Sequence, residues 1–241
     1  MILTRIHPAS AVETIDLDDP QSRDRLLDLY RPPVERWLRL NLITSVSGSA
    51  GGSDGTSETL TNPADRRLLG VIRELADVVL IGAESLRREG YLLPSRSRLA
   101  VVTGSGDLDG HRLAPEIETG RMLVLCPESA VPAVRASLGG RSVEIVVVAD
   151  VDGRLAIADI VDALHRRGHL SIVCEGGPRL TAQLVADRLV DEVCLSTSPT
   201  IGGTSLPLLV GAEVQTQSLE LSQLLVDGAS GLYARWSVGR G

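Results

Sequence analysis

The chain of 241 residues contains no phenylalanine, and aromatic side chains make up only 2% of it. Its core is therefore expected to rest on Val, Leu and Ile, and a hydrophobic share of 43% excludes a disordered chain. A folded chain of this length buries roughly 70–75% of the surface that its unfolded form exposes. It can build a core without metals or disulfides.

Long apolar runs and a secretory signal are also missing. No run approaches the roughly 20 residues of a membrane-spanning helix, and the N-terminus lacks an apolar stretch followed by a small-residue cleavage site. Basic residues are outnumbered, since 24 Lys and Arg against 31 Asp and Glu give a net charge of −7. That balance disfavours a nucleic-acid binder but leaves room for a pocket that holds one phosphate. The sequence predicts a soluble, cytoplasmic protein.

Cysteine and histidine are scarce and give no sign of a metal site or a disulfide. The three cysteines lie in or at the end of apolar, strand-like runs, and no Cys-x-x-Cys pair occurs. We interpret Cys126, Cys174 and Cys194 as buried structural thiols rather than nucleophiles. The four histidines show no spacing typical of metal ligands, so no bound metal is expected.

Beyond residue 33 the pattern alternates between short apolar runs, typical of buried strands, and helical segments. It predicts an α/β fold: a mostly parallel sheet with helices on both faces and an antiparallel hairpin as its C-terminal edge strands. We expect one domain over residues 34–241 and an N-terminal extension, residues 1–33, that packs on it and contains a helix at 23–30. Strands are expected at 37–43, 77–82, 98–103, 121–126, 143–148, 170–174, 191–197, 218–226 and 231–238, and further helices at 63–75, 129–138, 157–167 and 178–187.

The strongest candidate for a binding loop is Val-Cys-Glu-Gly-Gly-Pro-Arg-Leu at residues 173–180, between a predicted strand and a predicted helix. Two successive glycines let backbone N–H groups approach a ligand closely, and the start of a helix offers unpaired donors to a phosphate. Pro178 suits the first helical position. A tight strand-to-helix turn without a ligand has the same pattern, and both interpretations stay open.

Three further segments permit a functional interpretation. For each of them taken alone, a purely structural interpretation is the default. Residues 81–89 follow an apolar strand, where ligands bind in open α/β sheets, and place Ser85 and Glu89 four residues apart. The Gly/Ser-rich residues 48–57 form either a lid over a site or a plain connection. Arg73 and Arg96 could each bind an anion, or could be surface arginines.

These loops occur in the order and spacing of the reductases of riboflavin biosynthesis. The sequence resembles the 5-amino-6-(5-phosphoribosylamino)uracil reductase family, and within it the stand-alone pyrimidine reductase family proteins of actinobacteria. The resemblance covers about residues 37–236, and its most specific part is Glu-Gly-Gly-Pro followed by Val-Asp-Glu and then Pro and Gly-Gly. It rests on residues 41–48, 61–63, 69–77, 79–89, 175–180, 189–192, 199 and 202–203.

The resemblance implies a dihydrofolate-reductase-like fold, a homodimer with the C-terminal strands near its interface, and NADPH as the cofactor. The implied reaction reduces the ribosylamino C1′, as its imine, to a ribitylamine by hydride transfer. No catalytic acid or base is identified, although Glu175 is the carboxylate to test. The positions that match substrate contacts are Ser57, Arg73, Leu93, Arg96 and Glu175. Those that match cofactor contacts are Ile43, Thr59, Ser85, Glu89, Gly104, Gly176, Gly177, Pro178, Arg179, Leu180, Thr181, Ala182 and Gln183.

The chain departs from the family pattern at a few positions. Ser47 replaces the usual Asp of a Ser-x-Asp-Gly loop, Ser85 replaces a Thr, Glu89 an Asp, and Gly90-Tyr91 an Asp-Pro pair. We expect these changes to affect substrate choice or activity more than cofactor binding. The alternatives are a reductase of dihydrofolate or another pterin, and a catalytically silent NADP-binding relative. The Cys/His motif of the zinc deaminase found in many bacterial relatives is missing here.

Overall fold

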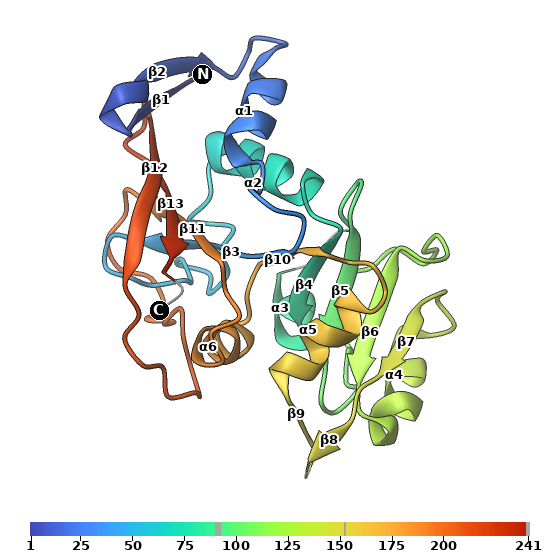
Figure 1. Cartoon of the computed structure of the whole chain (residues 1–241). Helices are drawn as coiled ribbons and strands as arrows, with labels where there is room; N and C mark the ends of the chain where they lie inside the picture. The colour runs from blue at the N-terminus through green and yellow to red at the C-terminus, as the bar shows by residue number, and fades with distance from the viewer. Residues whose placement is uncertain (90–92, 152, 240–241) are drawn as a thin grey trace.

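The structure, a computed structural model, describes residues 1–89, 93–151 and 153–239. The described residues form one 11-stranded sheet in the order β2-β1-β12-β13-β11-β3-β10-β4-β5-β6-β7, and a small separate hairpin, β8-β9 (Figure 1). The strands are β1 (Ile2–His7), β2 (Glu13–Asp16), β3 (Trp37–Ser45), β4 (Val78–Gly82), β5 (Arg98–Val102), β6 (Met122–Cys126), β7 (Glu144–Val147), β8 (Asp150–Val151), β9 (Arg154–Leu155), β10 (Ser171–Cys174), β11 (Glu192–Ser198), β12 (Leu219–Asp227) and β13 (Leu232–Val238).

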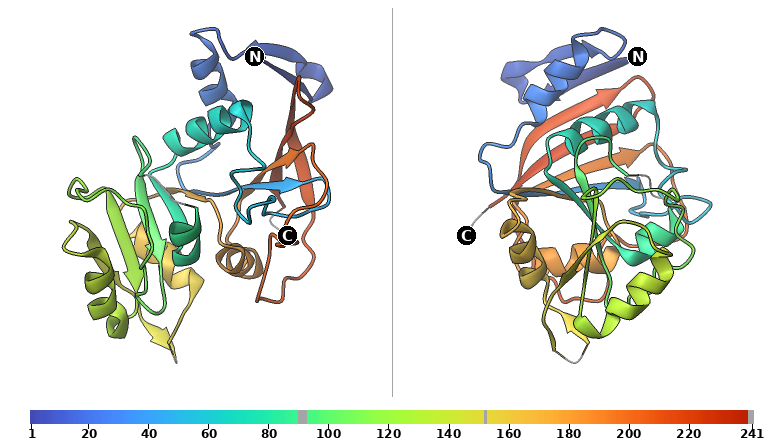
Figure 2. Two further views of the ribbon diagram at one scale, coloured as in Figure 1. Left: turned by 180° about the vertical axis from the view of Figure 1, so that it is seen from behind. Right: turned by 90° about the vertical axis from the view of Figure 1, so that its right-hand side faces the viewer.

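The helices cover both faces of the sheet, as the sequence predicts (Figure 2). One apolar core joins the sheet to α1–α4, and a second joins the opposite face to α5 and α6. The three cysteines are buried and unpaired, which confirms their structural interpretation. The helices are α1 (Ser22–Tyr30), α2 (Pro63–Glu74), α3 (Ala83–Arg88), α4 (Val131–Leu138), α5 (Ile157–His165) and α6 (Pro178–Ala186), with 3-10 turns at Ala9–Ala11 and Glu128–Ala130.

The seven strands from β11 to β7 run parallel to one another. Their sequences explain why they are interior: the first four residues of β4, Val-Val-Leu-Ile, are all fully buried, as expected for a strand covered on both faces. Helix α2 starts where expected, because the Asn62 side chain accepts a hydrogen bond from the Asp65 N–H at 2.9 Å and Pro63 occupies the first helical position. The predicted fold class is confirmed.

The antiparallel end of the sheet is wider than the sequence predicts. The hairpin β12-β13 forms as expected, but β1 pairs with β12, and β2 pairs with β1. The N-terminal residues thus continue the sheet beyond the hairpin, while α1 packs against α2. These two strands escape prediction because β1 lacks a clean alternation: Ile2 and Ile6 are exposed while Leu3 is buried.

A buried ion cluster joins this N-terminal part to the sheet. We call Tyr30, Arg39, Glu192 and Arg235 the Glu192 cluster. The Glu192 carboxylate contacts both guanidinium groups, with the Arg235 Nε at 2.8 Å from its Oε1, and Arg39 also donates to the Tyr30 carbonyl at 2.6 Å. The Tyr30 ring lies 5.0 Å from the Arg235 guanidinium carbon, within cation–π range. Burial acts to raise the pKa of Glu192, but the two guanidinium groups outweigh it and hold the pKa below its usual range.

Candidate functional site

A pocket of about 470 Å³ lies at the carboxyl ends of β3, β4 and β10, beside α2 and the starts of α3 and α6. This is the edge at which ligands bind in α/β sheets. The pocket brings together residues that lie far apart in the sequence and that the sequence analysis selected from separate loops. Those residues are Ile43, Ser57, Arg73, Ser85, Glu89, Glu175, Gly176, Gly177, Pro178 and Thr181.

The turn between β10 and α6 requires glycine. Gly176 and Gly177 have φ values of 111° and 66°, a region that favours glycine. A Cβ at Gly177 would also lie 3.6 Å from the Ser85 Oγ and 3.9 Å from the Gly82 backbone, and so would fill the space beside the turn. The backbone at this turn is therefore open to a ligand.

The first turn of α6 adds a second sign of a ligand. Thr181 lines the pocket and is fully buried, and its hydroxyl has the Cys174 thiol beside it. A thiol is a weak hydrogen-bonding partner, so the hydroxyl keeps capacity for a stronger one. Together with the unpaired N–H groups of the helix start, this hydroxyl fits the phosphate groups of a dinucleotide.

Arg73 and Glu175 form a paired fork at the other side of the pocket. The Arg73 Nε and Nη2 donate to the two carboxylate oxygens of Glu175 at 2.7 and 2.6 Å. The Glu175 side chain is only 5% exposed, against 24% for Arg73. Burial raises the pKa of the Glu175 carboxyl, and the contact with Arg73 opposes that shift. The pair offers a polar, oriented surface to a substrate.

The Gly/Ser-rich loop closes one side of the pocket. Ser57 donates to Glu89 at 2.6 Å, and partial desolvation of the Glu89 carboxyl raises its pKa. The Ala50 N–H donates to the Leu206 carbonyl at 2.7 Å, so the loop is docked on the segment after β11. In this structure the loop is a wall of the pocket.

Ser47 does not line the pocket. Its hydroxyl accepts the Gly202 N–H at 2.9 Å and lies 3.3 Å from the Gly202 carbonyl oxygen. The side chain joins two loops, because residues 45–49 turn back on the segment after β11. The replacement of the usual Asp by Ser47 therefore bears on the packing of these loops in the structure, whereas the sequence analysis placed it in substrate recognition.

Several positions matched to cofactor contacts lie outside the pocket lining. Leu180 and Ala182 point into the apolar core, because a helix that borders a pocket turns its other face to the sheet. Arg179 and Gln183 are exposed on α6. Thr59 donates to Asp54 at 3.1 Å, and Gly104 lies beyond the end of β5. These six assignments stay predictions.

Two positions matched to substrate contacts are also placed elsewhere. Leu93 packs against the apolar core that joins the sheet to α1–α4, and Arg96 forms an ion pair with Glu74 at 2.5 Å. The departure at Gly90-Tyr91 falls outside the described residues. Of the matched substrate positions, the pocket thus holds Ser57, Arg73 and Glu175.

The sequence analysis missed several polar side chains of the pocket lining. Asn41, Thr61 and Asp65 line the pocket, and Asp65 accepts hydrogen bonds from Thr61 and from Ser196 on β11, both at 2.6 Å. A signal was present for Asp65, because it lies eight residues before Arg73 in α2 and therefore on the same side of that helix. The contact with Ser196 bridges 131 residues and has no local signal.

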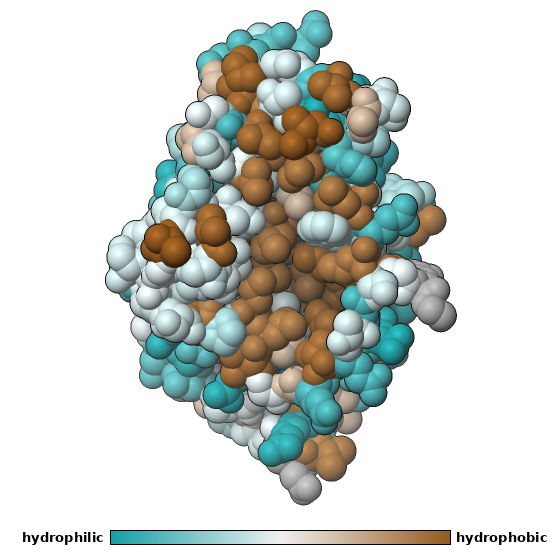
Figure 3. Space-filling model, turned by 90° about the vertical axis from the view of Figure 1, so that its left-hand side faces the viewer, coloured by the Kyte–Doolittle hydropathy of each residue, from teal (hydrophilic) through white to brown (hydrophobic). Residues whose placement is uncertain are grey.

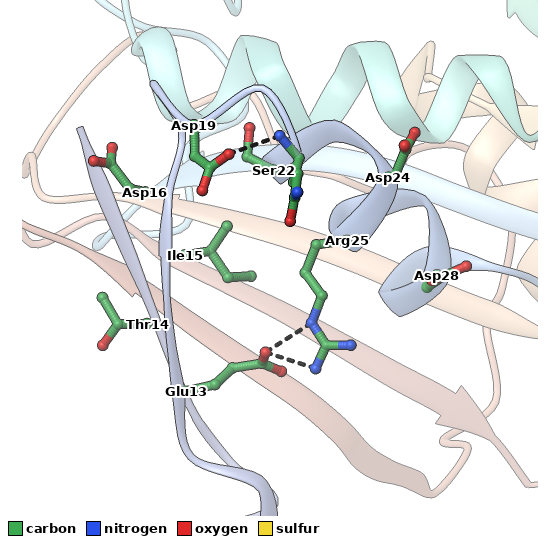
Figure 4. Close-up of a pocket in the computed structure, with 10 residues that line it drawn as sticks. Glu13, Thr14, Ile15, Asp16, Asp19, Ser22, Asp24, Arg25 and Asp28 are labelled. Carbon is green, nitrogen blue, oxygen red and sulfur yellow. Dashed lines mark hydrogen bonds and ion pairs between the residues drawn. The ribbon is translucent and has the colours of Figure 1, made fainter.

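A second hollow, formed by described residues of the N-terminal part, contains none of the matched site residues. This hollow of about 540 Å³ lies between β2 and α1, with Glu13, Asp16 and Asp28 among its lining (Figure 4). Its Glu13 already pairs with Arg5 and Arg25. Within the described ranges, no three His, Cys, Asp or Glu side chains are grouped to hold a metal ion, and no helix has the length and apolar character to span a membrane.

Residues 36–230 match the family model of the RibD C-terminal domain. The chain belongs to this family. The fold agrees: a pyrimidine reductase-like protein from Corynebacterium diphtheriae superposes with a TM-score of 0.76 and 22% identity, covering 90% of this chain and 99% of that one. The RibD C-terminal domain family comprises reductases of riboflavin biosynthesis with the dihydrofolate-reductase-like fold.

Curated relatives are similar at lower identity. The riboflavin biosynthesis protein RibD of Chlamydia pneumoniae is 22% identical over 188 residues, which is 73% of this chain and 49% of that protein. The chain thus spans about half the length of that relative. A 2,5-diamino-6-ribosylamino-4(3H)-pyrimidinone 5′-phosphate reductase of Aquifex aeolicus is 27% identical over 173 residues, or 68% of this chain and 75% of that protein.

Proposed function

We propose that the protein is an NADPH-dependent reductase of a pyrimidine ribotide, of the 5-amino-6-(5-phosphoribosylamino)uracil reductase type. The observation that carries this proposal is the pocket itself: a glycine turn suited to phosphate and the Arg73–Glu175 fork face one cavity. Family membership supports the same reaction, in which the bound nicotinamide supplies a hydride.

The residues of the chain would mainly bind and orient. The Gly176-Gly177 backbone, the first turn of α6, and the hydroxyls of Ser85 and Thr181 would hold the cofactor phosphates. The Arg73–Glu175 fork would orient the substrate, because each partner fixes the other in one geometry. The site therefore gains its rate chiefly from positioning.

A side chain at Gly177 tests the cofactor assignment. We expect Gly177→Val to weaken NADPH binding by more than tenfold, because the new side chain occupies the space beside the turn. Gly140→Val is the matched control, since Gly140 also has a positive φ but open space around it. Fluorescence titration with NADPH measures both. Equal affinities in folded proteins would refute the phosphate turn.

Turnover tests the substrate. We expect NADPH oxidation in the presence of the pyrimidine ribotide and little with dihydrofolate. Turnover of the pterin alone would favour the alternative reductase. Cofactor binding without turnover of either compound would favour the silent relative.

A homodimer is part of this proposal. Partly exposed apolar side chains form two rows across β12, β13 and β11. One row is Leu224, Ala234 and Leu195, and the other is Leu221, Trp236 and Val193. Figure 3 shows a broad apolar area on the side of the molecule that carries β12. Exposed patches of this kind usually mark an interface. We call this surface the β12 face.

Light scattering tests the β12 face. We expect twice the chain mass of 25.6 kDa at micromolar concentration, and the chain mass for Leu224→Glu. A wild-type protein of single chain mass would overturn the dimer. The cytoplasmic location and the boundary after residue 33 likewise stay predictions.

A further inference from the structure

Helix α2 presents a stripe of three side chains to the pocket. Asp65, Leu69 and Arg73 are each four residues apart and all line it. The stripe extends about 12 Å along the helix axis. It carries a carboxylate at one end, an apolar side chain in the middle, and at the other end a guanidinium engaged by Glu175.

The Asp65 carboxylate is held in place by neutral groups. Thr61 donates to its Oδ2 and Ser196 to its Oδ1, both at 2.6 Å. A carboxylate has about four lone-pair sites, so each oxygen keeps a free one. Among the residues that the structure describes, Asp65 forms no ion pair. The side chain is half-buried at the pocket wall, so it is an oriented, charged acceptor that faces the cavity.

Apolar side chains border the same part of the cavity. Leu69 follows Asp65 on α2, and Leu42 and Ile43 come from β3. A flat heterocycle bearing N–H donors fits a slot with apolar walls and a charged acceptor, because the ring faces meet apolar groups and the ring edge meets the carboxylate.

We propose that Asp65 is a specificity-determining residue that accepts hydrogen bonds from the amino and N–H groups of the substrate heterocycle. This inference rests on the proposed function and assigns which side chain recognises the ring. It gives the cofactor turn and Asp65 separate tasks, so that changing Asp65 should leave the affinity for NADPH unaltered.

The test is Asp65→Asn in the full chain. The variant keeps the size of the side chain and removes its charge, so we expect KM for the pyrimidine ribotide to rise about 10- to 100-fold, with a smaller change in kcat and an unchanged Kd for NADPH. Asp159→Asn is the matched control, because Asp159 occupies the equivalent third position of α5, away from the pocket. It should change neither constant.

A substrate analogue without the ring amino group sharpens the test. Wild type and Asp65→Asn should use this analogue almost equally well, because the pair of groups that interacts is already broken. If Asp65→Asn raised KM equally for the substrate and for the analogue, the ring amino group would not be the donor to Asp65.

Two other outcomes are distinct. An unchanged KM with a lower melting temperature would show that Asp65 only secures the start of α2, which overturns the inference and leaves the proposed function intact. A wild-type protein that turns over no pyrimidine ribotide would overturn the proposed function, and this inference with it.

Discussion

The molecule contains two arginine–glutamate arrangements that differ in what surrounds them. In the Glu192 cluster two guanidinium groups meet one carboxylate that is 2% exposed, beneath α1. In the pocket a single guanidinium meets Glu175, and this pair borders a cavity. The pKa of Glu192 is lowered because the effect of two guanidinium groups exceeds that of burial. The pKa of Glu175 is raised because the effect of burial exceeds that of its single guanidinium partner.

The difference shows how one chemistry serves two purposes. A carboxylate with excess positive charge around it is locked in its ionised form and ties segments together. A buried carboxylate with one partner and an open side still has capacity to interact with a ligand. Local pattern alone does not separate Arg73 from Arg39, since both are arginines next to apolar positions, and it is the surroundings in the structure that distinguish the two roles.

Removing the carboxylate of the Glu192 cluster should have the largest effect. Glu192→Gln leaves two buried guanidinium groups without a counter-charge, and we expect the free energy of unfolding to fall by about 3–5 kcal/mol. Glu144→Gln is the control, since Glu144 is 40% exposed and pairs with Arg167 at 2.9 Å. Its cost should be about 0–1 kcal/mol. Urea unfolding measures both, and equal costs would contradict a stabilising role for the cluster.

Changing the pocket pair should affect catalysis more than stability. Arg73→Lys keeps the charge but loses the two parallel donors that contact Glu175. We expect kcat/KM for the pyrimidine ribotide to fall roughly 10- to 100-fold, equivalent to about 1.4–2.7 kcal/mol. Arg67→Lys, on the exposed side of the same helix, should leave it unchanged. If Arg73→Lys lowered stability as much as Glu192→Gln and left turnover normal, the role of Arg73 would be to stabilise the fold and not to orient the substrate.

The smallest expected effect is a pair of opposite pH dependences of the free energy of unfolding. Because folding raises the pKa of Glu175 above its ordinary 4.5, stability falls as pH rises from 4.5 toward the raised value. Because folding lowers the pKa of Glu192, its contribution is present above 4.5 and is lost as pH falls through the folded value. Glu175→Gln should remove the first slope and Glu192→Gln the second. Urea unfolding from pH 3 to 8 checks this, and slopes of the same sign would refute the comparison.

The sequence predicted the parallel half of the sheet well because its signals are local. Buried strands such as β4 are continuous apolar runs, and the Asn62-Pro63 start of α2 depends only on neighbouring residues. The Gly176-Gly177 turn is local in the same way, since positive φ values call for glycine. The N-terminal strands are different, because β2 has a single buried residue, Ile15, and β1 depends on a distant partner.

The pocket could be predicted only in part for the same reason. Glycines and charged residues near strand ends drew attention to its lining, and family resemblance gave them an order. The partners of each side chain come from distant segments: Glu175 lies 102 residues from Arg73, and Gly202 lies 155 residues from Ser47. Local patterns do not contain those contacts. The sequence therefore contained no sign that Ser47 bonds to Gly202, and Asp65 was missed as a lining residue.

The pairing of β1 with β12 also determines when this end of the sheet can form during translation. The His7 ring bonds to the Leu221 carbonyl across 214 residues. At the usual 5–20 residues per second, a ribosome needs roughly 10–40 s to travel that distance. During this interval the newly made first strand can pair with β2 but not with β12, while most of the parallel strands are already available to one another. The antiparallel end of the sheet is thus the last part of the protein that translation allows to assemble.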